Sequence, residues 1–213
     1  MRRYISAIVT AAGESTRMGR PKPLLPWQGV PLIRYQVDSL VAAGVDEVVG
    51  VLGHHYESIR QVVPDTSSKI VYNQDYRHGK TTSVIKGVGS LSSISTDLVL
   101  LAVDQPRPAK LIASVIDNHI RNNALITSPR YQGRGGHPLI FSASLRNELE
   151  SITSEGQGIR EVFDAHRGEV NELLVDDPLF RLDLNTPSVY TVAYSRYGAD
   201  ANLVNESTNC GGY

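Results

Sequence analysis

The chain has 213 residues, of which 41% are hydrophobic and 20% charged, and this size and composition predict one globular domain with a sizeable core. Lys and Arg total 21 against 22 Asp and Glu, so the formal charge of −1 gives no general attraction to nucleic acid or to an anionic membrane. The single cysteine, Cys210, excludes a disulfide framework and a thiolate metal cage, and it favours a reducing, cytoplasmic setting. No stretch approaches about 18 consecutive apolar residues, so we expect neither export nor a membrane span.

Short β-branched runs alternate with stretches of helical period, a pattern typical of a layered α/β domain with a largely parallel sheet. Strands are expected at Tyr4–Thr10, Glu47–Leu52, Lys69–Tyr72, Leu98–Val103, Ala124–Thr127, Leu139–Phe141 and Val170–Val175. Helices are expected from Pro31, as the first helical residue, to Gly44, and at Tyr56–Val63, Thr82–Leu91, Pro108–Arg121, Ser144–Ser151 and Gly158–Ala165. The polar stretch Ser195–Tyr213 is expected to be a flexible tail after one domain at residues 1–194.

The stretch TAAGESTRMGRPKPLLPW, residues 10–27, directly follows the first predicted strand. Ligands of an open α/β sheet bind beyond the carboxyl ends of its strands, so this turn is a candidate binding site. Its small residues, Ala11–Gly13, let backbone amides come close to an anion, and Ser15 and Thr16 add hydroxyl donors. The turn is therefore suited to wrapping phosphate.

Three cations, Arg17, Arg20 and Lys22, lie within six positions of this turn. Arg17 offers a planar fork for phosphate oxygens and Lys22 a mobile point charge, a pairing that suits a polyphosphate. Pro21 and Pro23 stiffen the segment, so less freedom is lost on binding. From composition alone, a solvated loop whose cations pair with surface carboxylates is an equal alternative.

Residues 11–22 read Ala-Ala-Gly-Glu-Ser-Thr-Arg-Met-Gly-Arg-Pro-Lys and are followed by Leu24-Leu25-Pro26-Trp27. This long motif resembles the one that opens the MobA/MocA-like nucleotidyltransferases. The resemblance covers about residues 4–194 and continues at Gly53-His54, Asn73, Gly79, Ser83, Asp104-Gln105-Pro106, Gly136-His137-Pro138 and Asp183-Leu184-Asn185-Thr186-Pro187. It implies an α/β fold of the Rossmann-like, three-layer nucleotidyltransferase type with a mostly parallel mixed sheet.

The resemblance also implies which residues bind the nucleotide. They are Ala11, Ala12, Gly13, Glu14, Ser15, Arg17, Lys22, Gly79 and Ser83, with Arg17 and Lys22 on the triphosphate of an NTP. At the base, a small Gly79 lets the backbone come close, and the Ser83 hydroxyl can donate or accept a hydrogen bond. The alternative for this segment is simply a helix capped by Thr81 or Thr82.

Two other nucleotide motifs are incomplete. HGKTTS, residues 78–83, looks like the end of a Walker A loop, but that motif needs a glycine five positions before Gly79, where the chain has Gln74. The first turn lacks Gly-x-Gly-x-x-Gly, and no acidic residue follows at the proper place in a second strand. A P-loop NTPase and a dinucleotide dehydrogenase are therefore both disfavoured.

Asp104 ends an apolar run and brings a carboxylate to the carboxyl edge of the predicted sheet. This position suits Mg²⁺, which takes one or two protein oxygens, although an N-cap before Pro108 is the alternative. The resemblance implies that Asp104 binds the metal and that a second ligand comes from an Asp-x-Asp-Thr-Pro segment. Asn185 replaces the usual carboxylate there, which should loosen Mg²⁺ binding or shift it towards Asp183.

The reaction that the resemblance implies is attack of a substrate phosphate on the α-phosphorus of an NTP, with release of pyrophosphate. Arg17, Lys22 and Asp104 would be its catalytic residues, because they position and neutralise the phosphates. The Ala-Ala-Gly form of the turn resembles the cytidylyltransferases of molybdenum cofactor maturation. Ala12 therefore points to CTP and to a molybdopterin-type acceptor, since its methyl group narrows the base pocket.

The acceptor side of the sequence is less specific. By the resemblance, Arg134 and His137 contact the acceptor, with a structural loop as an equal alternative, and a molybdoenzyme or its chaperone would be a partner. Two other functions stay open, namely an NTP transferase for a sugar phosphate or other small phosphorylated acceptor, and a non-catalytic nucleotide-binding regulator suggested by Asn185 and Lys80. His119, on the apolar face of a predicted helix, is expected in the core.

Overall fold

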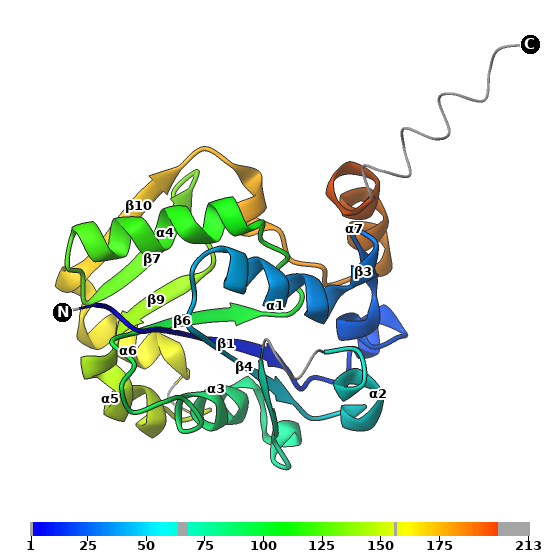
Figure 1. Cartoon of the computed structure of the whole chain (residues 1–213), viewed down its shortest axis with the longest axis horizontal. Coiled ribbons are helices and arrows are strands. Elements are labelled where there is room, and N and C mark those ends of the chain that lie inside the picture. Colours follow the sequence, from blue (N-terminus) through cyan, green and yellow to red (C-terminus); the bar gives the residue numbers. More distant parts are fainter. Residues whose placement is uncertain (1, 64–67, 156, 200–213) are drawn as a thin grey trace, which may run out of the picture.

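The computed structural model of the chain describes residues 2–63, 68–155 and 157–199 and shows a central sheet with helices on both faces (Figure 1). Seven strands lie in the order β10-β7-β9-β6-β1-β4-β5, and the eighth, β8, pairs with β7. Their bounds are β1 Ile5–Ala11, β4 Glu47–Leu52, β5 Lys69–Tyr72, β6 Asp97–Ala102, β7 Ile126–Tyr131, β8 Arg134–Gly135, β9 Leu139–Ser142 and β10 Val170–Val175.

The sheet is mixed but mostly parallel, as the sequence predicts. The neighbours β1 and β4, β1 and β6, β4 and β5, and β7 and β10 are parallel, whereas β9 runs antiparallel to both β6 and β7. Parallel strands bring their carboxyl ends to one edge, so the loops that follow β1 and β6 emerge side by side.

Helices form the two outer layers (Figure 1). Helix α1 (Leu32–Ala42) and helix α4 (Ala109–Arg121) pack together on one face. The other face carries α3 (Lys80–Val88), α5 (Arg146–Ser151) and α6 (Ile159–Ala165), and the short helices α2 (Tyr56–Arg60) and α7 (Pro187–Ala193) lie at the carboxyl edge. Single turns of 3-10 helix occur at Thr16–Met18, Lys22–Leu24, Tyr76–His78, Ala143–Leu145, Arg167–Glu169 and Pro178–Arg181.

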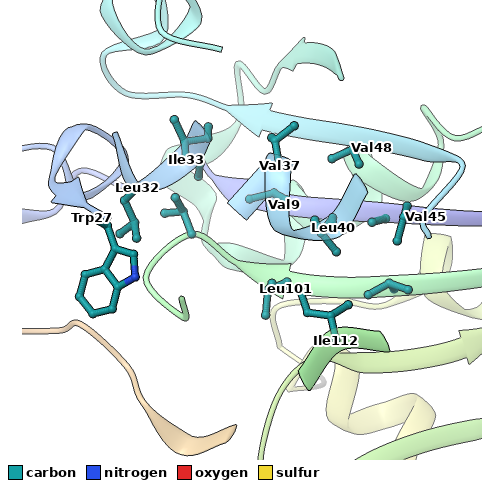
Figure 2. Packing of buried hydrophobic residues seen from close by; sticks show 14 of the residues in the cluster. Val9, Trp27, Leu32, Ile33, Val37, Leu40, Val45, Val48, Leu101 and Ile112 are labelled. Atoms are coloured by element: carbon teal, nitrogen blue, oxygen red, sulfur yellow. The ribbon is translucent and has the colours of Figure 1, made fainter. Parts of the chain in front are cut away.

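Alternation along β1 divides the core into two. Ala7 and Val9 belong to the cluster under α1 and α4, whereas Ile8 belongs to the cluster under α3 and α5. In Figure 2, Val37 and Leu40 of α1 lie over the strand residues of the first cluster. The apolar stripe that the sequence shows after Pro31 is thus the face by which α1 covers the sheet.

Helix α1 begins one residue later than expected. Pro31 has an extended backbone (φ −58°, ψ 140°) and pairs in a hairpin of β2 (Pro26–Trp27) with β3 (Val30–Pro31), so Leu32 is the first helical residue. The hairpin, β8 and α7 have no counterpart among the expected elements. The two-residue strands are too short for a periodic pattern, and only their pairing defines them.

The domain boundary expected at residue 194 falls inside a packed turn. Tyr194–Gly198 form a π-helical turn that continues α7, and the Gly198 carbonyl accepts a hydrogen bond from the Gln28 amide at 2.7 Å. The rest of the expected tail, residues 200–213, lies outside the described residues. Within the described part of the chain, no helix combines the length and apolar character needed to cross a bilayer.

Candidate active site

A cleft of about 290 Å³ lies at the carboxyl ends of β1 and β6. It brings together ten of the predicted site residues, namely Ala11, Ala12, Gly13, Ser15, Arg17, Lys22, Gly79, Ser83, Asp104 and Asn185. These residues come from the loop after β1, the start of α3, the loop after β6 and the segment before α7. The sheet topology therefore assembles the site from four distant parts of the chain.

The loop after β1 is held in one shape by its own contacts. Ser15 and Gly19 both adopt left-handed backbone conformations, with φ of 56° and 72°. The Ser15 carbonyl accepts from the Met18 amide at 2.9 Å, and its hydroxyl oxygen accepts from the Lys22 amide at 3.1 Å. Since the Met18 side chain is buried, the loop is anchored to the core before any ligand arrives.

Lys22 lies between the two predicted metal ligands. Its ammonium nitrogen, Nζ, is 2.6 Å from Asp104 Oδ2 and 2.9 Å from Asn185 Oδ1. The Lys22 and Asp104 side chains are only 13% and 19% exposed, so their attraction is less screened than at the surface. A carboxylate oxygen and an amide oxygen thus surround one cation.

This donor set fits a magnesium ion. Mg²⁺ prefers oxygen ligands and usually takes only one or two from protein, with water and phosphate completing its shell. Among the described residues, no group of three or more His, Cys, Asp or Glu side chains could hold a metal by itself. A metal here would rest on Asp104, Asn185 and oxygens of a bound nucleotide. Nearby, Asp183 Oδ1 is buried and has no hydrogen-bond partner among the described residues.

Two backbone hydrogen bonds place the Asn185 segment. The Leu184 amide donates to the Asp104 carbonyl at 2.8 Å, and the Asn185 amide donates to the Asp183 carbonyl at 3.0 Å. Thr186 then caps α7, because its hydroxyl accepts from the Val189 amide. The cap ends this segment and leaves the Asn185 side chain facing the cleft.

At the other end of the cleft, Asn73 orients Ser83. The Asn73 side-chain amide donates to the hydroxyls of Thr82 at 2.9 Å and Ser83 at 3.1 Å. The Ser83 oxygen therefore acts as an acceptor, and its proton remains to be donated. The alternative for this segment, a helix capped by Thr81 or Thr82, is wrong in its cap, because Gly79, with φ 108°, occupies the N-cap and no side chain caps α3.

Three predicted residues do not line this cleft. Glu14 is exposed, 3.7 Å from the guanidinium of Arg77, and Arg134 is exposed on β8. The backbone amide of His137 donates to the Phe180 carbonyl at 3.0 Å, and its Nδ1 is buried without a partner in the described part of the chain. Burial lowers the pKa of His137 to about 4, and the positive charge of Arg107 adds to the effect. The ring is therefore neutral at pH 7.

Sequence reasoning missed four residues that line the cleft, which are Thr10, Tyr76, Ala102 and Val103. Thr16 and Pro23, which it placed in the candidate turn, line the cleft as well. Tyr76 could have been found, because it precedes Gly79 by three residues in a turn that ends at the cleft. Lys80, which the sequence connects only with the hypothesis of a non-catalytic regulator, also lines the cleft. His119 is a core residue, as expected, with its Nδ1 2.7 Å from the Thr127 hydroxyl.

Arg107 is the other residue that the sequence did not single out. It follows the Asp104-Gln105-Pro106 motif, and its side chain is completely buried. Burial lowers the pKa of Arg107 to about 10, although the carboxylates of Asp183 and Asp104 oppose the shift. The guanidinium is still charged at pH 7.

Comparisons with known proteins agree with this geometry. The family model described as "MobA-like NTP transferase domain" matches residues 7–170. The chain is 32% identical over 164 residues to nicotine blue oxidoreductase of Paenarthrobacter nicotinovorans, covering 73% of this chain and 79% of that protein. It is 26% identical over 197 residues to molybdenum cofactor cytidylyltransferase of Escherichia coli K12, covering 91% of this chain and 97% of that protein.

The fold is also found in solved structures. The crystal structure of Rv0371c from Mycobacterium tuberculosis H37Rv has a TM-score of 0.79 and 26% identity, covering 91% of this chain and 98% of that chain. Rv0371c in complex with manganese has a TM-score of 0.69 and 26% identity, covering 83% of this chain and 90% of that chain. The chain therefore belongs to the family of MobA-like NTP transferase domains and has their α/β nucleotidyltransferase fold.

Proposed function

We propose that this nucleotidyltransferase is Mg²⁺-dependent and moves CMP from CTP onto the phosphate of a molybdopterin-type acceptor, with release of pyrophosphate. The observation that carries the proposal is the convergence of Lys22, Asp104 and Asn185 at distances of 2.6 and 2.9 Å. The choice of acceptor is supported by the similarity to molybdenum cofactor cytidylyltransferase, which extends over 97% of that protein.

The catalytic residues act by position and charge. Arg17, at the exposed rim, and Lys22, inside the cleft, bind the triphosphate. Asp104 and Asn185 hold Mg²⁺, which when bound offsets the negative charge that grows on the phosphate oxygens. The acceptor phosphate forms a bond to the α-phosphorus as the bond to pyrophosphate breaks, so no protein nucleophile is needed.

The base pocket supports a pyrimidine. The Ala12 side chain is 4% exposed and lines the cleft, so its methyl group takes up room that a purine would use. Because the Asn73 amide already donates to the Ser83 oxygen, the Ser83 hydroxyl would donate its proton to an acceptor atom on the base. Cytosine offers such acceptors at O2 and N3, and one such contact contributes about 1 kcal/mol.

The acceptor approaches from the side of the cleft that carries the segment between β7 and β9. The His137 carbonyl accepts a hydrogen bond from Arg107 Nε at 3.1 Å, and Arg107 lies three residues after Asp104 in the chain. In this proposal, the exposed Arg134 provides a mobile cation for an anionic acceptor. The neutral His137 ring packs against the same acceptor.

The test measures pyrophosphate release with each of the four NTPs, Mg²⁺, and either no acceptor, molybdenum cofactor or a sugar 1-phosphate. We expect release with CTP and molybdenum cofactor only. Asp104→Asn should lower that rate by about 100-fold because a metal ligand is weakened, whereas the exposed Asp38→Asn, whose carboxylate pairs with Arg34, should not change it. Pyrophosphate release with the sugar 1-phosphate but not with molybdenum cofactor would mean that the acceptor is a sugar phosphate. No release with any combination of NTP and acceptor would favour a non-catalytic regulator.

A further inference from the structure

Arg107 connects three segments of the chain through backbone carbonyls. Its guanidinium donates to the carbonyl oxygens of Pro106 at 3.1 Å, His137 at 3.1 Å, Phe180 at 3.0 Å and Leu182 at 2.8 Å. The planar fork of arginine presents several donors in fixed directions, which the compact ammonium of lysine cannot reproduce. Burying a charged guanidinium costs free energy that hydrogen bonds to neutral carbonyls offset only in part. A role in the site would explain why the chain has an arginine at this position.

Two of the three segments that Arg107 joins carry the two predicted metal ligands. Pro106 follows Asp104 at the end of β6, and Leu182 precedes Asn185 before α7. Three of the hydrogen bonds described above link these segments directly. They are the bonds from the Arg107 guanidinium to the carbonyls of Phe180 at 3.0 Å and Leu182 at 2.8 Å, and the bond from the Leu184 amide to the Asp104 carbonyl at 2.8 Å.

We propose that Arg107 is a positioning residue that holds Asp104 and Asn185 at the spacing a divalent cation requires. The inference rests on the proposed metal-dependent function. Asp104 and Asn185 are far apart in the sequence, and their side-chain oxygens nevertheless meet at one cation, Lys22 Nζ. Arg107 acts from behind them and is not among the described residues that line the cleft.

A second contact constrains the same carbonyls. A Cβ atom added at Gly136 would lie 2.5 Å from the Phe180 carbonyl oxygen, which is a backbone atom and cannot rotate away. The loop at Gly136 therefore approaches Phe180 as closely as a glycine permits. Gly136→Ala would push on the Phe180 carbonyl, to which Arg107 also donates, without altering the arginine.

The test measures Mn²⁺ affinity by electron paramagnetic resonance in the presence of a non-hydrolysable CTP analogue. Arg107→Lys keeps the charge but loses the fork, and we expect Mn²⁺ affinity to fall by about tenfold or more. Binding of the analogue without metal should change by less than about twofold, because Ala12 and Ser83 are untouched. A purely structural role would not separate these two affinities.

Arg146→Lys is the matched control. Arg146 also donates to three carbonyls, those of Val88 at 3.2 Å, Leu91 at 3.3 Å and Ser92 at 2.7 Å, but it does so beside α3 and α5. We expect its loss to leave Mn²⁺ affinity unchanged. An equal fall in both lysine variants would mean that general loosening, not positioning, is responsible.

Gly136→Ala keeps the inference testable if Arg107→Lys does not fold. We expect it to weaken Mn²⁺ binding in the same direction, whereas Gly168→Ala, where nothing lies within 4 Å of the added atom, should have no effect. Unchanged Mn²⁺ affinity in Gly136→Ala or in folded Arg107→Lys would overturn the inference, as would a wild-type protein that binds no Mn²⁺. If the wild type binds Mn²⁺ and these variants bind it more weakly, but the wild type transfers no nucleotide, only the proposed function is contradicted.

Discussion

Two sets of acceptors compete for the Lys22 ammonium. One set is the side-chain oxygens of Asp104 and Asn185, and the other is the phosphates of a bound nucleotide. Without ligand the ammonium occupies the position between those oxygens. A nucleotide would draw Lys22 to the phosphates and free both oxygens for the metal. Metal and nucleotide should therefore bind together rather than in turn.

Lys22→Met tests this exchange. We expect turnover to fall by about two to three orders of magnitude, in line with the loss of one preorganised donor to the transition state. At the same time, Mn²⁺ binding to the nucleotide-free protein should become tighter, because no ammonium competes for Asp104. The exposed Lys110→Met is the control for both measurements. Weaker Mn²⁺ binding in Lys22→Met would contradict the exchange.

Asn185→Asp should supply the carboxylate that the resemblance leads one to expect. One more negative charge beside Asp104 favours a divalent cation, and we expect Mn²⁺ affinity to rise by about tenfold. Lys22 pairs with the new carboxylate as well, so turnover need not rise with affinity. Mn²⁺ titrations of the wild type and the variant, each with the CTP analogue, decide the point. Equal affinity would show that Asn185 does not touch the metal.

At the scale of elements, α3 positions the base end of the cleft by packing directly on the sheet. An added Cβ at Gly87 would lie 2.5 Å from Ile8 Cγ2 of β1 and 3.2 Å from Val51 Cγ2 of β4. Gly87→Ala should therefore push α3 outward and destabilise the fold by about 1–3 kcal/mol, as overpacking usually does. Gly89→Ala, at the exposed end of the helix, meets nothing closer than 3.4 Å.

Urea unfolding of the two alanine variants gives the comparison. We expect a lower midpoint with an unchanged slope for Gly87→Ala, and a shift within about 0.5 kcal/mol for Gly89→Ala. Affinity for the CTP analogue should fall only in Gly87→Ala, because Gly79 and Ser83 move with the helix. Equal stability of the two variants would mean that α3 can shift freely on β1.

For the whole molecule, His137 makes stability depend on pH. Burial lowers its pKa in the folded state to about 4, from an ordinary value of 6.5. As the pH falls from 6.5 to 4, the unfolded chain binds a proton that the folded chain does not, so the free energy of unfolding falls by up to about 3 kcal/mol. The stabilisation is fully present above pH 6.5.

Urea unfolding at pH 7 and pH 4.5 checks this dependence. His137→Asn should reduce the difference between the two values. His166 provides a contrast, because the hydrogen bonds that its ring donates to Glu169 and Glu148 raise its pKa. Its contribution to the free energy of unfolding is present below pH 6.5 and is lost as the pH rises through the raised pKa. His166→Gln should therefore not abolish the decrease in the free energy of unfolding between pH 7 and pH 4.5. The same pH difference in His137→Asn as in the wild type would contradict the assignment.

Much of the architecture followed from local pattern. The apolar runs at β1 and β6 predicted buried parallel strands, and that topology by itself brings the loop of Lys22 next to Asp104. The period of the segment after Pro31 predicted α1, although the pairing of Pro31 with β2 moved its first residue. Short-range pattern was sufficient here because a strand that is buried on both faces needs a continuous apolar run, which is a local property of the sequence.

The sequence by itself thus determined the layered α/β fold, the family, and a loop of small residues and cations at the carboxyl edge of the sheet. Only the tertiary structure decided that Lys22 lies between Asp104 and Asn185, that Asn73 directs the Ser83 hydroxyl, and that Arg107 holds the carbonyls behind the site. The reason is that these contacts join residues distant in the chain through single hydrogen bonds, often to backbone carbonyls. Every residue has such a carbonyl, so the sequence carries no sign of which one is used.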